Sequence, residues 1–204
     1  MATPAITRER FEQGMTIEQY QAQMTQNKDA FAANIASAQA RPEDLAFFQG
    51  LPEPLNVVVI TEDWCGDALA NVPVLAKVAA ETGKLTLRVF LRDQNLDLAD
   101  RYLKEGKYRS VPVFVFFDQR MRERGHFIER PARATAEMNA ATARLVAEHP
   151  ELPDAGGSFD EMGEPAKRLR MQALRDLRRE RAAAWTTMLL EDIEALLSVS
   201  PAGR

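Results

Sequence analysis

The stretch Thr61-Glu62-Asp63-Trp64-Cys65-Gly66-Asp67-Ala68 lies between two apolar segments of different periodicity. Before it, residues 55–60 are almost all β-branched or aliphatic, which is typical of a central strand covered on both faces. After it, apolar residues recur at helical spacing, at Leu69, Val72, Leu75, Ala76 and Ala79. The sequence therefore predicts a strand, a turn that carries Cys65, and a helix that ends near Gly83.

Cys65 is the only cysteine among the 204 residues. No disulfide can form within the chain, and the residue three positions later is Ala68. A redox role would therefore be monothiol, with the resolving sulfur supplied by a small thiol, a partner protein or a second subunit. A lone cysteine also argues against a disulfide-stapled secreted framework, and residues 1–11 contain no apolar signal core, so we expect a cytoplasmic protein.

The composition argues against two classes of partner. A formal net charge of −4 and a pI near 5.4 give no case for nucleic acid, because surfaces that bind it are usually basic. No apolar run approaches the ~20 residues that a membrane-spanning helix needs. The longest runs, around Val57 and Val113, have the length of strands. We therefore expect neither nucleic acid nor a membrane as a partner.

The chain beyond the first helix continues to alternate between strand and helix patterns. The expected elements are a strand over 85–91, a short helix over 97–103, strands over 113–117 and 121–127, and a helix from Pro131 to about Glu148. The order is βαβ, a helix, a β-hairpin and a helix. It suits a mixed sheet in which the first two strands are parallel and the hairpin adds an antiparallel edge.

Helical extensions are expected on both sides of this central domain. Thr16 and Gln19 form a capping box, so a helix begins at Ile17 and continues one apolar face through Phe31 and Ile35. Residues 166–199 predict one long helix or a broken pair with an apolar stripe. The expected bounds are an N-terminal helical extension over 1–53, the central domain over 54–149, a linker over 150–165 and a C-terminal long helix over 166–204.

Several motifs along the central domain occur together in a known family. They are Trp64-Cys65-Gly66 at the turn, Pro73 in the following helix, Val111-Pro112 before a strand, Gly125 in the hairpin, and Arg130-Pro131 before the next helix. With these motifs the chain resembles the thioredoxin-like superfamily, and more closely bacterial thioredoxin family proteins with a single-cysteine Trp-Cys-Gly-Asp-Ala turn. The resemblance implies an α/β thioredoxin-like fold, a mixed four-stranded sheet in the order βαβ-α-ββ-α with N-terminal and C-terminal helical extensions.

The resemblance also implies a site around Cys65. A thiolate at a helix N-terminus faces unpaired N–H groups and the positive end of the dipole, which favours its nucleophilic form. Cys65 is therefore the expected catalytic residue. The residues expected to shape the site or bind substrate are Trp64, Gly66, Asp67, Arg109, Val111 and Pro112. A cis peptide before Pro112 would expose the backbone of Val111 to an extended peptide or a glutathione-like substrate.

Charges near the cysteine act in opposite directions. Glu62, Asp63 and Asp67 disfavour a thiolate, and Arg109 is the expected counter-charge. The three carboxylates could form a metal-binding or acid-base cluster, but we favour the interpretation that they cap the helix and complement its dipole. Thioredoxins carry a buried acidic residue in the strand that leads to the site. The resemblance implies that Val59 occupies this position here.

Neither histidine nor the basic C-terminal run indicates a site. His126 and His149 lack the spacing of zinc ligands, so we expect no metal and no cofactor. The basic run is interrupted by Asp176 and Glu180 and contains no aromatic residue, which favours a solvated helix face. Its members are Lys167, Arg168, Arg170, Arg175, Arg178, Arg179 and Arg181.

Three functions are open on these patterns. The first is a monothiol thiol-disulfide oxidoreductase, in which Cys65 forms mixed disulfides with a protein or with a low-molecular-weight thiol such as glutathione. The second is a redox-inactive binding or adaptor module that uses its helical extensions for a partner or a homodimer. The third is an iron–sulfur role like that of monothiol glutaredoxins, which Glu62 and Asp63 disfavour because those proteins are basic just before the cysteine.

Overall fold

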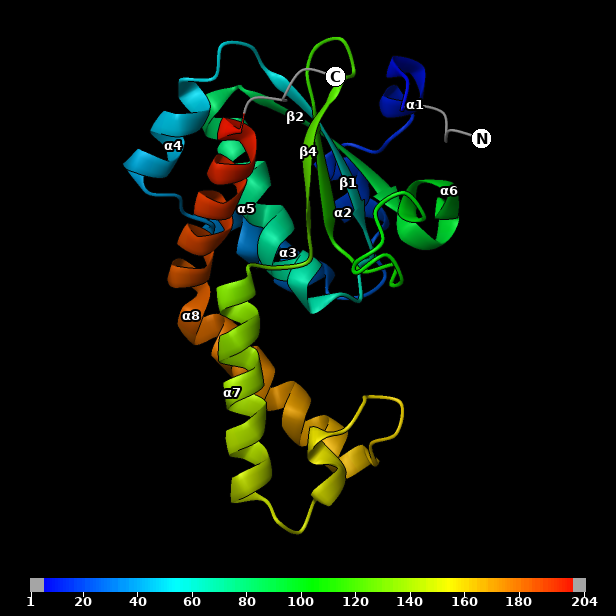
Figure 1. Cartoon of the computed structure of the whole chain (residues 1–204), viewed down its shortest axis with the longest axis vertical. Helices are drawn as coiled ribbons and strands as arrows, with labels where there is room; N and C mark the ends of the chain where they lie inside the picture. The colour runs from blue at the N-terminus through cyan, green and yellow to red at the C-terminus, as the bar shows by residue number, and fades with distance from the viewer. Residues whose placement is uncertain (1–5, 200–204) are drawn as a thin grey trace. The chain divides into compact units, whose positions relative to one another are not determined.

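The computed structural model describes residues 6–199, which form two compact units (Figure 1). The first unit contains the residues up to Arg130 and those from Leu189 onward, and the second contains Pro131–Met188. The expected domain bounds differ from this division and stay a prediction. The first unit contains α1 (Arg8–Glu12), α2 (Ile17–Gln23), α3 (Lys28–Ser37), α4 (Pro42–Gln49), β1 (Leu55–Thr61), α5 (Gly66–Thr82), β2 (Leu85–Leu91), η1 (Arg92–Gln94), α6 (Leu96–Ala99), β3 (Val113–Phe117) and β4 (Glu123–Ile128).

The four strands form one mixed sheet in the order β2-β1-β3-β4. β1 pairs in parallel with β2, from Leu55 opposite Leu85 to Thr61 opposite Leu91. β3 is antiparallel to both β1 and β4. α5 packs against β2, and α3 and α4 pack against α5. This arrangement confirms the predicted α/β fold class with a parallel first pair of strands and an antiparallel hairpin at the edge.

β1 forms the centre of the core. All seven of its residues are buried, and each Val or Ile side chain taken out of water there stabilises the fold by about 1.5–3 kcal/mol. Both polar atoms of the buried Asn56 amide are bonded, because its nitrogen donates to the carbonyl of Asp118 and its oxygen accepts from Arg8. The strand is therefore a rigid base for the turn that follows it.

The turn after β1 leads directly into α5. Cys65 is the N-cap of this helix, with an extended backbone, and its carbonyl accepts the N–H of Leu69 at 3.0 Å. Gly83 ends the helix at φ 64°, a left-handed conformation that glycine adopts without strain. The strand, the turn and the end of the helix near Gly83 are thus confirmed.

The N-terminal extension differs from the expected single apolar helix. The capping box of Thr16 and Gln19 is present, but α2 ends at Gln23 and α3 begins at Lys28. The N–H groups of Thr25 and Gln26 in the break are bonded to the Asp63 carboxylate. The break is therefore stabilised by a residue of the cysteine turn, which no local pattern in the extension indicates.

The second unit contains α7 (Ala132–Glu148), η2 (Pro153–Gly156) and most of α8 (Glu164–Ser198). Its buried residues form two small clusters, one around Trp185 and Met138 and one around Leu145 and Met162. α8 is one continuous helix of 35 residues, which agrees with the expected long helix and not with a broken pair. From Leu189 onward, its residues Leu189, Leu190, Ile193 and Leu197 are buried in the core of the first unit.

Candidate functional site

A cavity of about 880 Å³ in the first unit opens beside Cys65. Its walls come from the β1–α5 turn, from η1 and α6, from the loop before β3, and from the end of β4. Among the expected site residues, the lining includes Trp64, Cys65, Asp67, Arg109 and Val111. Segments separated by up to about a third of the chain thus converge on one thiol.

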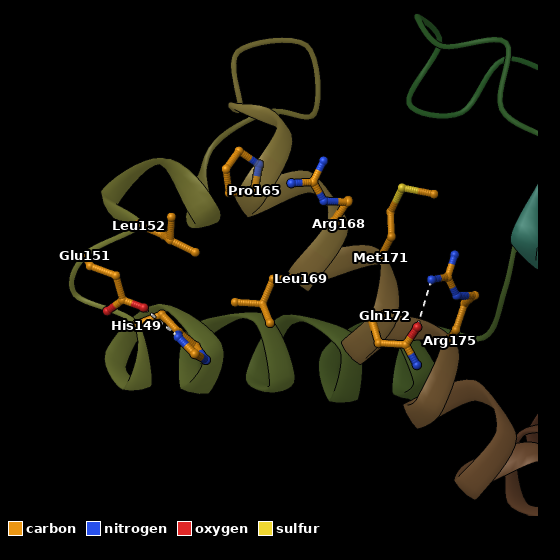
Figure 2. A pocket seen from close by; sticks show the side chains of 9 residues that line it. All are labelled: His149, Glu151, Leu152, Pro165, Arg168, Leu169, Met171, Gln172 and Arg175. Carbon is orange, nitrogen blue, oxygen red and sulfur yellow. Dashed lines mark hydrogen bonds and ion pairs between the residues drawn. The ribbon is translucent and has the colours of Figure 1, made fainter.

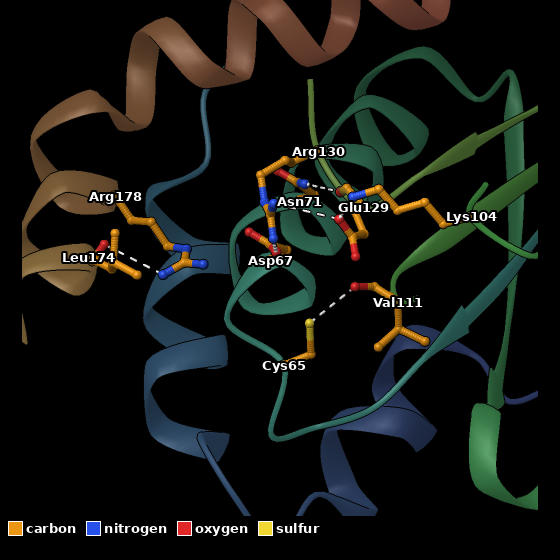
Figure 3. Close-up of polar contacts among 9 residues, drawn as sticks. All are labelled: Cys65, Asp67, Asn71, Lys104, Val111, Glu129, Arg130, Leu174 and Arg178. Carbon is orange, nitrogen blue, oxygen red and sulfur yellow. Dashed lines mark hydrogen bonds and ion pairs between the residues drawn. The ribbon is translucent and has the colours of Figure 1, made fainter. Parts of the chain in front are cut away.

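The thiol of Cys65 contacts the loop before β3. Cys65 is 8% exposed, and its Sγ donates to the carbonyl of Val111 at 3.2 Å (Figure 3). The peptide bond between Val111 and Pro112 is cis. The N–H of Glu129, at the end of β4, donates to the carbonyl of Pro112 at 2.7 Å. The loop is therefore bonded on one side to the cysteine and on the other to β4.

Gly66 and Ala68 lie in the first turn of α5. Gly66 is the first residue of the helix, and Ala68 is 2% exposed at the position where a dithiol thioredoxin carries its resolving cysteine. Val59 is fully buried in β1, opposite Val89 and Phe114. The strand therefore presents an apolar side chain where the resemblance implies an acid in thioredoxins.

Glu62 and Asp63 bond to elements other than α5, so the interpretation that they cap this helix is wrong. Glu62 is buried and accepts the N–H of Asp93 at 2.8 Å, and burial raises the pKa of its carboxyl. Partial burial also acts to raise the pKa of Asp63, but the N–H groups of Gln26 and Thr25 outweigh it and leave this pKa below the usual value. Each carboxylate therefore stabilises a neighbouring loop through hydrogen bonds to its backbone.

Of the three acidic residues near Cys65, only Asp67 lines the same cavity as the thiol. It is 6% exposed in the first turn of α5 and forms an ion pair with Arg130 (Figure 3). Burial alone would lower the pKa of the Arg130 guanidinium, but the hydrogen bond to Asp67 and the negative charges of Asp67, Glu129 and Cys65 raise it. Arg130 is therefore the cation whose field acts on the thiol and on its nearest carboxylate together.

Glu129 joins Arg130 to a wider polar network. Its carboxylate lies 3.5 Å from Arg130 Nη1 and 2.5 Å from Lys104 Nζ. Its carbonyl accepts from the amide of Asn71 in α5 at 2.7 Å. Arg130 is predictable from the sequence only as part of a family motif, and Asn71, Lys104 and Glu129 carry no local signal, because no spacing rule brings these residues together.

Arg109 lies on the cavity wall and forms an ion pair with Asp100. Its Nε and Nη2 donate to the two carboxylate oxygens of Asp100 at 2.5 and 3.0 Å. The hydrogen bond from Arg109 lowers the pKa of Asp100. The expectation that Arg109 is the counter-charge of Cys65 stays a prediction.

The rim of the cavity is apolar and exposed. Trp64 is 44% exposed, Leu96 42% and Tyr108 49%, and all three line the cavity. The guanidinium of Arg92 lies 5.0 Å from the centre of the Trp64 ring, and Lys107 lies 5.2 Å from that of Tyr108. Each of these two rings is thus within the distance of a cation–π contact with a neighbouring side chain.

Neither histidine belongs to this site. His126 pairs with Glu123 and His149 with Glu151. Within residues 6–199, no group of three or more His, Cys, Asp or Glu side chains is arranged to hold a metal ion. The described helices also include none that is long and apolar enough to cross a membrane.

A second hollow lies within the second unit, between the end of α7 and the first turns of α8 (Figure 2). His149 and Glu151 pair on one of its sides, and Arg175 donates to Gln172 on the other. Further along the basic run, Arg179 pairs with Asp176, and Arg181 pairs with Glu137. Much of the basic run thus pairs within its own unit.

The fold and the site define a protein of the thioredoxin-like class, in which a cysteine begins the helix after the first buried strand and a proline loop faces it. A protein-family model described as Thioredoxin matches residues 14–144. The chain belongs to this thioredoxin family, Thioredoxin_9. No curated protein matches the chain.

Two solved structures share the fold. An HIV epitope-scaffold superposes with a TM-score of 0.62 at 16% identity, over 94% of this chain and 97% of the scaffold. A protein of unknown function from Pseudomonas aeruginosa, PA1234, gives a TM-score of 0.50 at 16% identity, over 83% of this chain and 95% of its own. At this identity the likeness concerns the fold alone.

The hydrogen bonds that the Asp63 carboxylate accepts from Thr25 and Gln26 predict a pH-dependent contribution to stability. Because the folded-state pKa of Asp63 is lowered, its contribution is present above the ordinary value of 3.8 and is lost as the pH falls through the folded-state pKa. We expect Asp63→Asn to lower the free energy of unfolding at pH 7 by about 1 kcal/mol. Urea unfolding at a series of pH values measures this difference, which should shrink towards zero in acid. A difference that stays constant down to pH 2 would contradict the assignment.

Proposed function

We propose that this protein is a monothiol thiol-disulfide exchange protein in which Cys65 forms a mixed disulfide with its substrate. The observation that carries the proposal is the position of Sγ, at the start of α5, 3.2 Å from the Val111 carbonyl and on the wall of a large open cavity. The helix end supplies N–H groups that favour a thiolate, and the cavity supplies the approach. We also propose that the chain represents the single-cysteine bacterial branch with a Trp-Cys-Gly-Asp-Ala turn.

The chemistry takes place in two balanced exchanges. In the first, the Cys65 thiolate attacks one sulfur of a substrate disulfide, the old S–S bond breaks, and the other sulfur leaves as a thiolate. In the second, an external thiolate attacks the mixed disulfide, releasing Cys65 and forming a new disulfide with the captured group. Ala68 cannot supply the second thiol, so a small thiol such as glutathione, or a partner protein, must do so.

The polar network beside Cys65 supports the first exchange. Deprotonation releases the carbonyl of Val111, since a thiolate no longer donates to it. The backbone of Val111 then becomes available to an extended substrate, as in strand addition. Arg130 supports the new negative charge, while its ion pair with Asp67 keeps that carboxylate from repelling it.

The exposed rim supports a protein substrate over a small one. Trp64, Leu96 and Tyr108 line the same cavity as the thiol and expose apolar surface that a segment of a protein substrate could contact. A single cysteine, with no second one to form a disulfide in the chain, suits a reducing compartment, so we propose that the exchange takes place in the cytoplasm.

One observation favours the alternative of a redox-inactive adaptor. Cys65 is only 8% exposed and its thiol is already bonded within the chain. Against this alternative, part of the apolar stripe on α8 is buried in the first unit, from Leu189 to Leu197, and is not available to a partner. An adaptor would therefore bind through another surface.

Incubation with an excess of oxidised glutathione, followed by intact-mass spectrometry, tests the proposed exchange. We expect the native protein to gain one glutathionyl group and to lose it on addition of a reducing thiol, because Cys65 is the only thiol in the chain. Cys65→Ser is the matched blank. A native protein that gains the group no faster than a free cysteine of ordinary pKa would contradict the proposal and favour the adaptor.

The role of Arg130 predicts a change in the pH dependence of Cys65 alkylation. We expect Arg130→Gln to shift the midpoint of the pH–rate profile upward by about one unit, because the mutation removes a cation whose charge acts on Cys65 and breaks the ion pair with Asp67. Arg109→Gln is the control, since its charge is shared with Asp100, and should shift the midpoint less. Arg130→Lys keeps the positive charge, so its midpoint should stay close to that of the native protein. A larger shift in Arg109→Gln would instead assign the counter-charge to Arg109.

A further inference from the structure

A second cavity of the first unit shares no lining residue with the one beside Cys65. It has a volume of about 400 Å³ and lies between α4, the segment that leads into β1, and the end of α8. Its apolar lining consists of Ala46, Phe47, Leu51, Pro52, Leu55 and Leu197. Gly50 and two charged residues, Glu53 and Arg124, complete the wall.

Arg124 is the feature of this cavity that ordinary packing does not explain. The residue is half-buried, and its Nε is inaccessible to solvent without a hydrogen-bond partner. Within residues 6–199, its guanidinium forms neither a hydrogen bond nor an ion pair, although Glu53 lines the same cavity. An unbonded Nε also occurs at Arg88, Arg130 and Arg170, but the terminal nitrogens of these three arginines are bonded within the protein. Arg124 differs from them because its whole guanidinium remains available to an anionic acceptor in the cavity.

The backbone of β4 is specifically shaped to place this arginine. Glu123 pairs with Phe117 and Gly125 with Phe116, so Arg124 is the extra residue of a β-bulge. Gly125 has φ 154°, and a Cβ there would lie 2.7 Å from Leu196 of α8. Bulges redirect side chains, and this one aims Arg124 at the cavity while glycine lets α8 approach the strand.

We propose that this cavity binds a monoanionic aliphatic carboxylate of medium chain length. The alkyl chain would pack on the apolar walls and the carboxylate would accept from the guanidinium of Arg124 in a charge-assisted pair. A volume of about 400 Å³ falls within the usual range for small-molecule sites. The negative charge of Glu53 selects against ligands that carry several anionic groups. The proposal does not depend on the chemistry of Cys65, which lines another cavity.

Isothermal titration of the full-length protein with octanoate, below its micellar concentration, tests the proposal. We expect octanoate to bind at least about tenfold more tightly than octanol, because only the carboxylate pairs with Arg124. Arg124→Met should weaken octanoate binding by about tenfold or more while changing octanol binding little. Glu53→Gln should leave octanoate binding unchanged or tighten it.

The stability of the ligand-free variant separates a binding role from a structural one. Because Arg124 has an unbonded Nε, Arg124→Met should unfold at the same or a higher temperature than the parent protein, yet lose the stabilisation that octanoate gives. If Arg124→Met fails to fold, chemical-shift changes of Phe47 and Leu51 in the parent protein report the same site. No binding of octanoate, or tighter binding of octylammonium than of octanoate, would overturn the proposal.

Discussion

The complete burial of β1 is the constraint on which the rest of this structure depends. A strand covered on both faces has one position in the sheet, and its last residue, Thr61, therefore fixes where the chain turns into α5. The turn has to place Cys65 at the start of that helix, within reach of the loop that precedes the neighbouring strand β3. The thiol is thus positioned by the hydrophobic core, and the polar residues around it only adjust its chemistry.

That adjustment relies on carboxylates that are each held by a partner. Glu62 accepts from η1, Asp63 accepts from the break between α2 and α3, and Asp67 pairs with Arg130. Acidic residues beside a nucleophilic sulfur would be unfavourable if they were free, but here two of them join neighbouring loops to the turn and the third is neutralised by a cation. The same groups that weaken a simple thioredoxin interpretation therefore stabilise the turn that carries Cys65.

Local patterns predicted the parts of this fold that depend on nearby residues. The buried strand, the helix that ends at Gly83 and the capping box at Thr16 each need only short-range signals, and all are present. The ion pair between Asp67 and Arg130 joins residues 63 positions apart, and no periodicity reports such a contact. The bulge at Arg124 likewise depends on how β4 meets β3 and α8, which a single sequence does not show.

The central claim is that the native fold makes Cys65 a better nucleophile than the same residue in an unfolded chain. The rate of its alkylation by iodoacetamide at pH 7, in the native protein and in the protein unfolded by urea, tests this claim directly. Because Cys65 is the only thiol, the unfolded chain is its own reference. We predict faster alkylation in the native protein, as expected where a helix end and Arg130 favour the thiolate. Slower alkylation in the native protein would mean that burial outweighs activation, and would contradict a redox role for this site.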